Sequence, residues 1–225
     1  MNTYIIHYPK LIDRKIYLEG VCQNIKWCSF TTKDSLSEEQ VLEFYSACPA
    51  TWEERTEGMY NGKVPFRELK PGDISCTANH ILAWKDFIEN DNNELGLFFE
   101  DDVILSENFY EKLDKIIEMA PLFDVLFLGG GFQHTVAPTI STKLIKDYTF
   151  ILKGHPSSNC VCSYVLNKDT AKTMVEFFET NKSVLPIDFE VNYILKKINA
   201  VVFHIMPMIC KEGSSIGQYA SIQTR

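Results

Sequence analysis

One short segment restricts the fold more than any other: the five consecutive apolar residues 95–99 lead directly into three carboxylates, Glu100, Asp101 and Asp102. A strand that is apolar along its whole length needs cover on both faces, as a central strand has in a sheet flanked by helices. In open α/β sheets, ligands bind beyond the carboxyl ends of the strands. The segment therefore predicts a central strand of an α/β sheet that delivers acidic side chains to a binding edge.

The rest of the chain alternates between short apolar runs and stretches with helical spacing. Strands are predicted at residues 4–8, 25–32, 95–99, 124–128, 144–152, 160–166 and 200–206. Helices are predicted at residues 11–18, 37–44, 71–88, 106–119, 169–178 and 188–198. Strands that alternate with helices indicate an α/β fold with a mostly parallel central sheet flanked by helices.

Length and composition indicate one domain over residues 1–225. A chain of 225 residues that is 45% hydrophobic supports one sizeable core and leaves little room for a second. Residues 48–69 lack periodicity and are predicted to form a long surface loop, either a lid or binding loop or a plain irregular connection. Residues 207–225 are predicted to form an irregular C-terminal segment.

The distribution of charge and apolar residues excludes several classes of protein. The formal net charge is −8 and no run of lysines and arginines is present, which argues against a nucleic-acid partner. No apolar stretch reaches the roughly 20 residues of a membrane-spanning helix, and no secretory signal opens the sequence. The seven cysteines include no CxxC pair, so we expect reduced thiols in a cytoplasmic protein.

The three carboxylates suit a hard divalent cation. Side chains alternate along a strand, so Glu100 and Asp102 are predicted to project to one side and Asp101 to the other. Oxygen ligands of this kind bind Mg²⁺ or Mn²⁺, and such a cation holds diphosphate oxygens and neutralises a departing nucleotide diphosphate. The alternative is a solvated acidic turn before the helix predicted from Ser106.

Short motifs in a fixed order run through the chain. They are Ile5-Ile6-His7, Asp13-Arg14-Lys15, Leu69-Lys70-Pro71-Gly72-Asp73-Ile74-Ser75-Cys76, His80, Phe98-Phe99-Glu100-Asp101-Asp102-Val103, Asp124-Val125-Leu126-Phe127-Leu128-Gly129, Ser163-Tyr164-Val165-Leu166, Ala171 and Leu185-Pro186-Ile187-Asp188. Together they resemble glycosyltransferase family 25, which contains lipooligosaccharide sugar transferases and collagen galactosyltransferases. Asp73, Ser75 and Asn79 depart from the residues common in that family and mark a divergent member.

The resemblance implies a GT-A-type fold and the inverting transfer of a hexose. The donor would be a nucleotide-diphosphate sugar, usually UDP-linked, and the acceptor a hydroxyl of a glycan or glycoprotein. Glu100 and Asp102 match the ends of the family's acidic motif and are expected to bind Mn²⁺ or Mg²⁺. Asp102 is the leading candidate for direct metal contact, and contact with the nucleotide ribose is the alternative for Glu100. Asp101 is expected to orient its neighbours beside the bound substrate.

Other residues near the predicted binding edge have two interpretations each. By resemblance, Asp13 and Arg14 contact the nucleotide; the alternative is an exposed ion pair at a helix start. His80 orients a carboxylate or touches the donor, unless it is a partly buried structural histidine. The glycines at residues 129–131 allow close approach of the backbone to a ligand.

An inverting transfer also needs a base that takes the proton of the acceptor hydroxyl. Asp188 is the predicted base, with a metal-ligand role as a variant, and Glu190 is a weaker substitute. Aspartate also suits the N-cap of a helix, so a purely structural Asp188 is the alternative.

Two other functions are compatible with the same acids. A metal-dependent phosphoesterase would release inorganic phosphate or cleave a phosphodiester without an acceptor sugar, although ligand-spaced His/Asp motifs are missing. A non-catalytic protein would bind a nucleotide sugar, or a protein partner, without turnover.

Overall fold

A computed structural model of the chain describes residues 1–59, 64–129 and 139–220. Its strands are β1 (Thr3–Ile6), β2 (Ile25–Cys28), β3 (Leu95–Glu100), β4 (Val103–Leu105), β5 (Val125–Phe127), β6 (Thr139–Ile145), β7 (Tyr148–Lys153), β8 (Ser163–Asn167), β9 (Val202–Met206) and β10 (Cys210–Glu212). Its helices are α1 (Ile12–Val21), α2 (Glu38–Phe44), α3 (Pro49–Thr56), α4 (Pro71–Asn90), α5 (Phe109–Met119), α7 (Lys168–Thr180) and α8 (Ile187–Lys197). Among the described residues, every helix is too short or too polar to cross a membrane.

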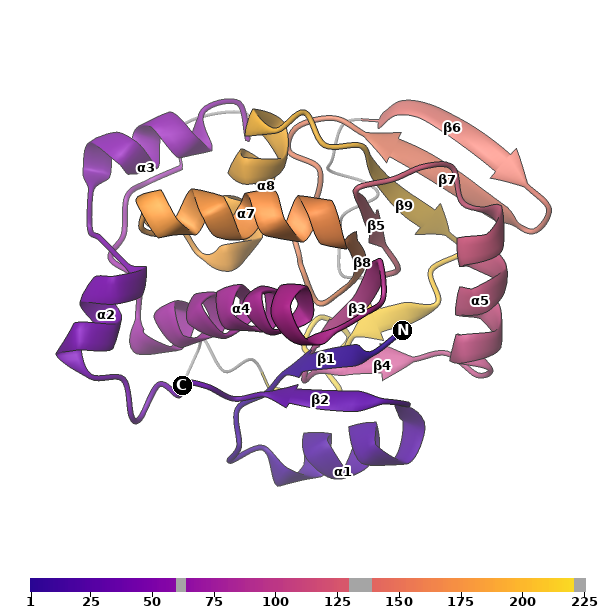
Figure 1. Cartoon of the computed structure of the whole chain (residues 1–225), viewed down its shortest axis with the longest axis horizontal. Helices are drawn as coiled ribbons and strands as arrows, with labels where there is room; N and C mark the ends of the chain where they lie inside the picture. The colour runs from indigo at the N-terminus through magenta and orange to yellow at the C-terminus, as the bar shows by residue number, and fades with distance from the viewer. Residues whose placement is uncertain (60–63, 130–138, 221–225) are drawn as a thin grey trace.

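Eight of the described strands form one sheet in the order β2-β1-β3-β8-β5-β9-β7-β6 (Figure 1). β1 runs parallel to both β2 and β3, and β5 runs parallel to β9. β8 lies antiparallel between β3 and β5, and β7 and β6 extend the sheet antiparallel beyond β9. β4 and β10 pair separately as a two-stranded antiparallel ribbon.

The α/β class is therefore confirmed, with a sheet that is mixed rather than mostly parallel. The single strand predicted over residues 144–152 is a hairpin of β6 and β7, which turns at Lys146 with a φ of 52°. A hairpin reverses the chain without the crossover helix that parallel neighbours need. The apolar pattern predicts where the strands lie, but it does not predict whether a strand pairs parallel or antiparallel with its neighbour.

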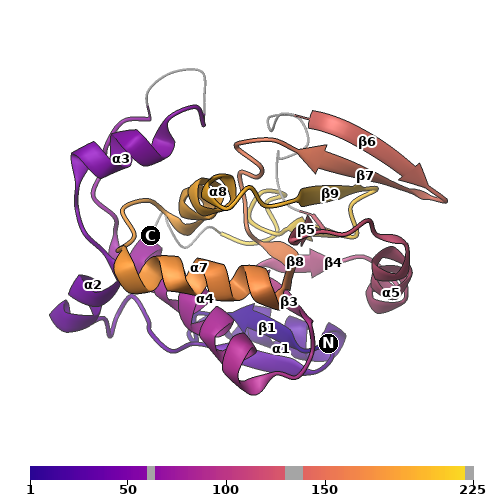
Figure 2. The ribbon, with the colours of Figure 1, turned by 45° about the horizontal axis from the view of Figure 1, so that its top comes forward.

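The two faces of the sheet bury alternate side chains of the same strands. Tyr4 and Phe98 belong to the core cluster beneath α4, α7 and α8, whereas Ile5 and Phe99 belong to the cluster beneath α1 and α5. Figures 1 and 2 both show α4 and α7 side by side over the first of these faces. The continuous apolar run is thus explained by helices on both faces of β3, and the same alternation directs Glu100 toward α4.

The surface loop predicted over residues 48–69 is wrong in its first part, which forms α3. Pro49 occupies a first-turn position that suits proline, and Trp52 is only 2% exposed. The indole Nε1 of Trp52 donates to the carbonyl of Val64 at 2.9 Å, and the ring belongs to the same buried cluster as Met59 and Leu69. A helix of eight residues is too short to give a clear periodic signal in the sequence.

The C-terminal segment predicted as irregular also contains a strand. β10 pairs with β4, the strand that follows the acidic residues. The backbone of Cys210 also forms an isolated parallel β-bridge with Gly129. A Cβ on Gly129 would lie 2.1 Å from the carbonyl oxygen of Cys210. The close approach expected at this glycine is therefore made by the chain's own backbone; Gly130 and Gly131 lie outside the described residues.

Candidate functional site

Glu100, the last residue of β3, points toward the N-terminal half of α4. Its Oε1 lies 3.5 Å from Sγ of Cys76 and 3.5 Å from Nε2 of His80. Cys76 and His80 are four residues apart on α4 and so share one face of the helix. The Glu100 side chain is 24% exposed, so the carboxylate borders solvent. His80 is fully buried and lies close to a carboxylate, which is one of the roles expected for it.

Asp101 points to the opposite side, as strand alternation predicts, and lies in a buried network. Its Oδ2 accepts from the backbone N–H of Tyr8 at 2.9 Å and lies 3.0 Å from Nδ1 of His7. Its Oδ1 accepts from Nη1 of Arg14 at 2.5 Å. These contacts attach the loop after β1 and the first turn of α1 to the end of β3. Asp101 is a positioning residue in this geometry.

Arg14 is consequently engaged within the protein. Besides Asp101, its guanidinium donates to the carbonyl of Ala220 at 2.8 Å and lies 4.9 Å from the centre of the Tyr219 ring. Asp13, in the same helical turn, is exposed. Arg14 is buried and pairs with Asp101, so it does not form the exposed ion pair with Asp13 that was the alternative expectation.

Asp102 follows in the turn between β3 and β4 and is 6% exposed. Its Oδ2 accepts from the backbone N–H of Ser214 at 3.1 Å, and its carbonyl accepts from the N–H of Gly213 at 2.7 Å. Its Oδ1 is buried without a hydrogen-bond partner among the described residues. A buried carboxylate oxygen that lacks a donor is costly unless a cation or a proton neutralises it.

Asp188 lies in the first turn of α8, after the N-cap Pro186, so it is not the N-cap itself. Its Oδ1 accepts from the backbone N–H of Val161 at 2.9 Å. The charges of Glu100 and His80 both act on it, which places it on the same side of the sheet as Glu100. The predicted base and the predicted metal ligands are thus brought together from segments almost 90 residues apart.

A fourth carboxylate, Glu212 of β10, joins these residues without having been predicted. Its pKa is raised by burial and then by the charge of Asp102, and its own charge acts on Glu100 and Asp188. The sequence signal was absent because β10 has three residues in a segment that otherwise reads as irregular. Glu100, Asp102, Asp188 and Glu212 are called the acid cluster below.

Burial and crowding in the acid cluster change the protonation of Glu100 and Asp188. Burial, then the charges of Asp102 and Glu212, raise the pKa of Glu100 to about 8. Burial and the charge of Glu100 raise the pKa of Asp188 to about 7, whereas burial lowers the pKa of His80 to about 4. Near neutral pH the site therefore holds a neutral imidazole and carboxyls that share protons, and a divalent cation would relieve their mutual repulsion.

This protonation makes the stability of the cation-free protein depend on pH. The ordinary pKa values are 3.8 for Asp188 and 4.5 for Glu100, and the native values are about 7 and about 8. Between these limits the native state binds more protons than the unfolded state, so we expect the free energy of unfolding to fall as pH rises from about 5 to about 8. Urea unfolding in chelator, repeated across this range, measures the slope. A free energy of unfolding that rises with pH over this range would contradict the raised pKa values of Glu100 and Asp188.

Glu190, the predicted substitute base, lies in a different environment. It is fully buried, and its Oε1 accepts from Nη1 of Arg55 at 2.7 Å and from the N–H groups of Val184 and Leu185 at 2.6 and 3.0 Å. An inverting base must reach an acceptor hydroxyl, and these contacts leave Glu190 no approach from solvent. These contacts favour a structural role for Glu190 over a catalytic one.

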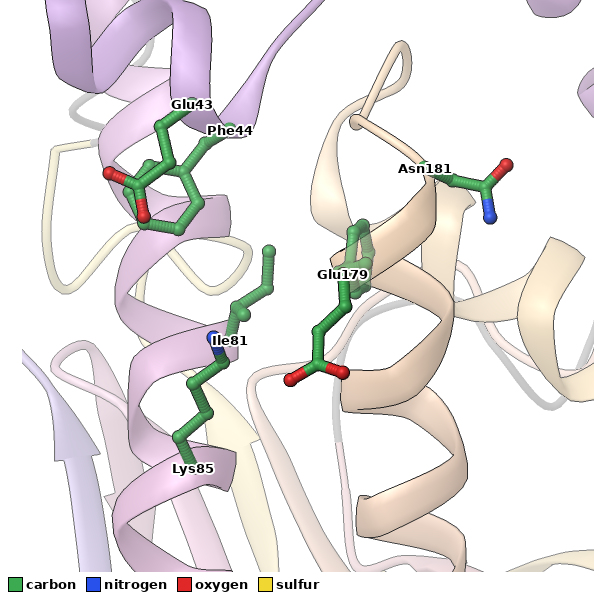
Figure 3. A pocket seen from close by; sticks show the side chains of 7 residues that line it. Glu43, Phe44, Ile81, Lys85, Glu179 and Asn181 are labelled. Carbon is green, nitrogen blue, oxygen red and sulfur yellow. The ribbon is translucent and has the colours of Figure 1, made fainter.

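A separate hollow lies between α2, α4 and the end of α7 (Figure 3). Phe44, Ile81 and Phe178 form its apolar part. Glu43, Lys85 and Glu179 add charged groups to its lining. Figure 3 shows the lining side chains coming from helices on the two sides of the hollow. Its lining includes none of the acid cluster, and nothing in the sequence had indicated it.

Comparison with known proteins gives a family match over most of the chain. The model of Glycosyltransferase family 25 (LPS biosynthesis protein) matches residues 1–191. Lipooligosaccharide biosynthesis protein lex-1 of Haemophilus influenzae is 25% identical over 169 residues, which cover 70% of this chain and 55% of that protein. A second protein of that organism, titled "Putative glycosyltransferase", is 35% identical over 76 residues, covering 32% and 27%. The chain thus spans about half the length of the first relative and about a quarter of the second.

Two solved structures show remote likeness. Mouse xyloside xylosyltransferase 1 in its apo form has a TM-score of 0.42 at 10% identity, with 89% of this chain and 69% of that chain covered. A197 from STIV has a TM-score of 0.37 at 14% identity, with 91% and 81% covered.

Proposed function

Since the chain belongs to glycosyltransferase family 25, we propose that it transfers a hexose from a nucleotide-diphosphate sugar, UDP-linked, to a hydroxyl of a glycan or glycoprotein acceptor. The transfer inverts the anomeric carbon and takes place on a GT-A-type domain over residues 1–225. The first relative named above is described as a lipooligosaccharide biosynthesis protein, which favours a lipid-linked glycan as the acceptor.

The observation that carries the proposal is the buried, unpartnered Oδ1 of Asp102 inside the acid cluster. Mn²⁺ and Mg²⁺ bind carboxylate oxygens, and a cation would replace the protons that the crowded carboxyls otherwise retain. Asp102 and Glu100 are the residues that would hold the cation. When bound, the cation supplies charge neutralisation for the diphosphate of the donor.

Asp188 acts as the base in this proposal. A general base is most effective when its pKa lies near the working pH, and burial and the charge of Glu100 raise the pKa of Asp188 to about 7 in the cation-free protein. The hydrogen bond from the N–H of Val161 fixes one carboxylate oxygen and leaves the other to accept the proton of the acceptor hydroxyl. The hydroxyl oxygen then attacks the anomeric carbon on the side opposite the departing diphosphate, which gives inversion.

Arg14 and Asp101 support the site indirectly. Their buried pair joins α1, the turn after β3 and the C-terminal residues near Ala220. Arg14 and Asp101 hold the turn that carries Asp102 in place and take no part in the reaction itself. Asp13, exposed in the same helical turn, keeps its proposed contact with the nucleotide.

The test is the release of nucleoside diphosphate with and without Mn²⁺, across a panel of nucleotide sugars and acceptors, in wild type and Asp102→Asn. Asparagine keeps an oxygen for the N–H of Ser214 but removes the charge, so the variant should fold and lose cation-dependent turnover by at least about 100-fold. Asp169→Asn, which alters an exposed surface pair on α7, is the matched control and should behave as wild type.

The same assay separates the other functions. Release of inorganic phosphate without any acceptor would indicate a phosphoesterase. A rise in melting temperature with a nucleotide sugar and Mn²⁺, without turnover on any acceptor, would indicate a non-catalytic binding protein. Full cation-dependent turnover in folded Asp102→Asn would refute the role given to Asp102.

A further inference from the structure

We infer that Cys76, His80 and Glu100 form a binding site for a borderline divalent cation of the zinc class. The inference concerns metal binding alone and does not depend on sugar transfer, although it shares Glu100 with the proposed function. Sγ of Cys76, an imidazole nitrogen of His80 and a carboxylate oxygen of Glu100 all lie within 4.8 Å of one another. The same carboxylate oxygen of Glu100, Oε1, lies near both Sγ of Cys76 and Nε2 of His80.

The two distances from Glu100 to the other ligand atoms match those that a tetrahedral ion requires. With Zn–S near 2.3 Å and Zn–N and Zn–O near 2.0–2.2 Å, two ligands of one tetrahedral ion are separated by about 3.4–3.6 Å. The Sγ–Oε1 and Nε2–Oε1 distances are both 3.5 Å. Three protein ligands leave a fourth position for water or a substrate atom, the arrangement of catalytic rather than closed structural zinc sites.

His80 provides the independent sign that a ligand belongs here. Its side chain is fully buried, and its Nε2 has no hydrogen-bond partner among the described residues although Glu100 lies 3.5 Å away. Its Nδ1 lies 3.0 Å from the hydroxyl of Tyr164, which also accepts from Nε1 of Trp84 at 2.9 Å. When Nδ1 carries the proton and donates to Tyr164, Nε2 presents a lone pair toward Cys76 and Glu100. Such a support of the second ring nitrogen is typical of metal-bound histidines.

The choice of ligand atoms determines the class of ion. Mg²⁺ prefers oxygen ligands, whereas a thiolate and an imidazole favour Zn²⁺ and similar ions. Cys76 and Glu100 are half-buried rather than enclosed, so an ion can reach them from solvent. The competing explanation is a simple hydrogen bond from the Cys76 thiol to the Glu100 carboxylate, which requires no ion.

Cobalt titration of the chelator-treated protein distinguishes the two explanations. Co²⁺ occupies zinc sites and gives a thiolate-to-cobalt charge-transfer band only when a cysteine is a ligand. We expect this band in wild type, its removal by added Zn²⁺, and its loss in Cys76→Ser together with at least about a 100-fold loss of Zn²⁺ affinity. Cys22→Ser, a matched change of a half-buried thiol at the end of α1, should retain the band. Tyr164→Phe should weaken Zn²⁺ binding by about 10-fold.

A second measurement covers the case in which Cys76→Ser does not fold. In wild type, Zn²⁺ should slow alkylation of Cys76 by iodoacetamide at least about 10-fold, read by peptide mass spectrometry, and should leave Cys48 unaffected. Absence of a charge-transfer band, its persistence in folded Cys76→Ser, or equal alkylation with and without Zn²⁺ would overturn the inference. Failure of the proposed sugar transfer would leave these readouts unchanged, so the two claims fail separately.

Discussion

Replacing Asp188 with asparagine is expected to lower kcat for sugar transfer by about 10²–10⁴-fold, the usual contribution of a general base. The amide oxygen of asparagine can still accept from the N–H of Val161, so the start of α8 should keep its position. The amide does not take a proton, however, and the acceptor hydroxyl remains a weak nucleophile. Initial rates at saturating donor and acceptor, with thermal unfolding measured in parallel, test this directly.

The pH profile of the wild-type protein provides the accompanying check. The rate should rise with pH through the pKa of Asp188, because only the carboxylate form accepts a proton. That pKa is about 7 in the cation-free protein. A bound cation lowers it, so the rise measured at fixed Mn²⁺ should be centred below pH 7. Glu179→Gln, an exposed change on α7 beside the separate hollow, serves as the matched control and should keep the wild-type rate. A folded Asp188→Asn with the wild-type rate would show that another group is the base.

Replacing Arg55 with alanine is expected to lower the free energy of unfolding by about 3–5 kcal/mol, because it leaves a carboxylate buried without its counter-ion. The Nη1 of Arg55 lies 2.7 and 2.9 Å from the two carboxylate oxygens of Glu190, and both side chains are almost fully buried. The guanidinium also lies over the rings of Phe177 and Tyr193, so packing is lost as well. Urea unfolding of wild type and variant measures the change.

The double variant Arg55→Ala with Glu190→Gln separates charge from packing. Glutamine keeps an oxygen for the N–H groups of Val184 and Leu185 but carries no charge, so part of the lost stability should return. Lys10→Ala, which removes the exposed pair between Lys10 and Asp34, should change stability little. If Arg55→Ala were as stable as wild type, the Arg55–Glu190 pair would not hold α3 to α8.

The sequence predicted the parts of the fold that local patterns determine. The apolar run at residues 95–99 is the body of β3, and the Ser37–Gln40 capping box is formed at the start of α2. Pro71 opens α4 as expected of a first-turn proline. The antiparallel insertion of β8 and the pairing of β10 with β4 join residues far apart in the chain, and no local pattern records such pairings.

In the site, too, local patterns predicted some features, whereas contacts between distant segments determine the others. Strand alternation was sufficient to send Glu100 and Asp101 to opposite sides, toward α4 and α1 respectively. Asp188 and Glu190 stand two residues apart in a helix with 3.6 residues per turn, about 200° around its axis, so they face different surroundings. The sequence lists both acids but does not indicate which face of the helix meets the acid cluster. Only packing against Val161 and Arg55 decides that.

The ribbon of β4 and β10 has a consequence for the order in which the protein matures. Ser214, which binds the Asp102 carboxylate, follows it by 112 residues, and Glu212 of the same stretch supplies the fourth acid. β9 is the last strand of the large sheet in chain order and ends at Met206, just before β10 begins at Cys210. The segment that covers Asp102 and brings Glu212 to the acid cluster is therefore made only after every strand of that sheet.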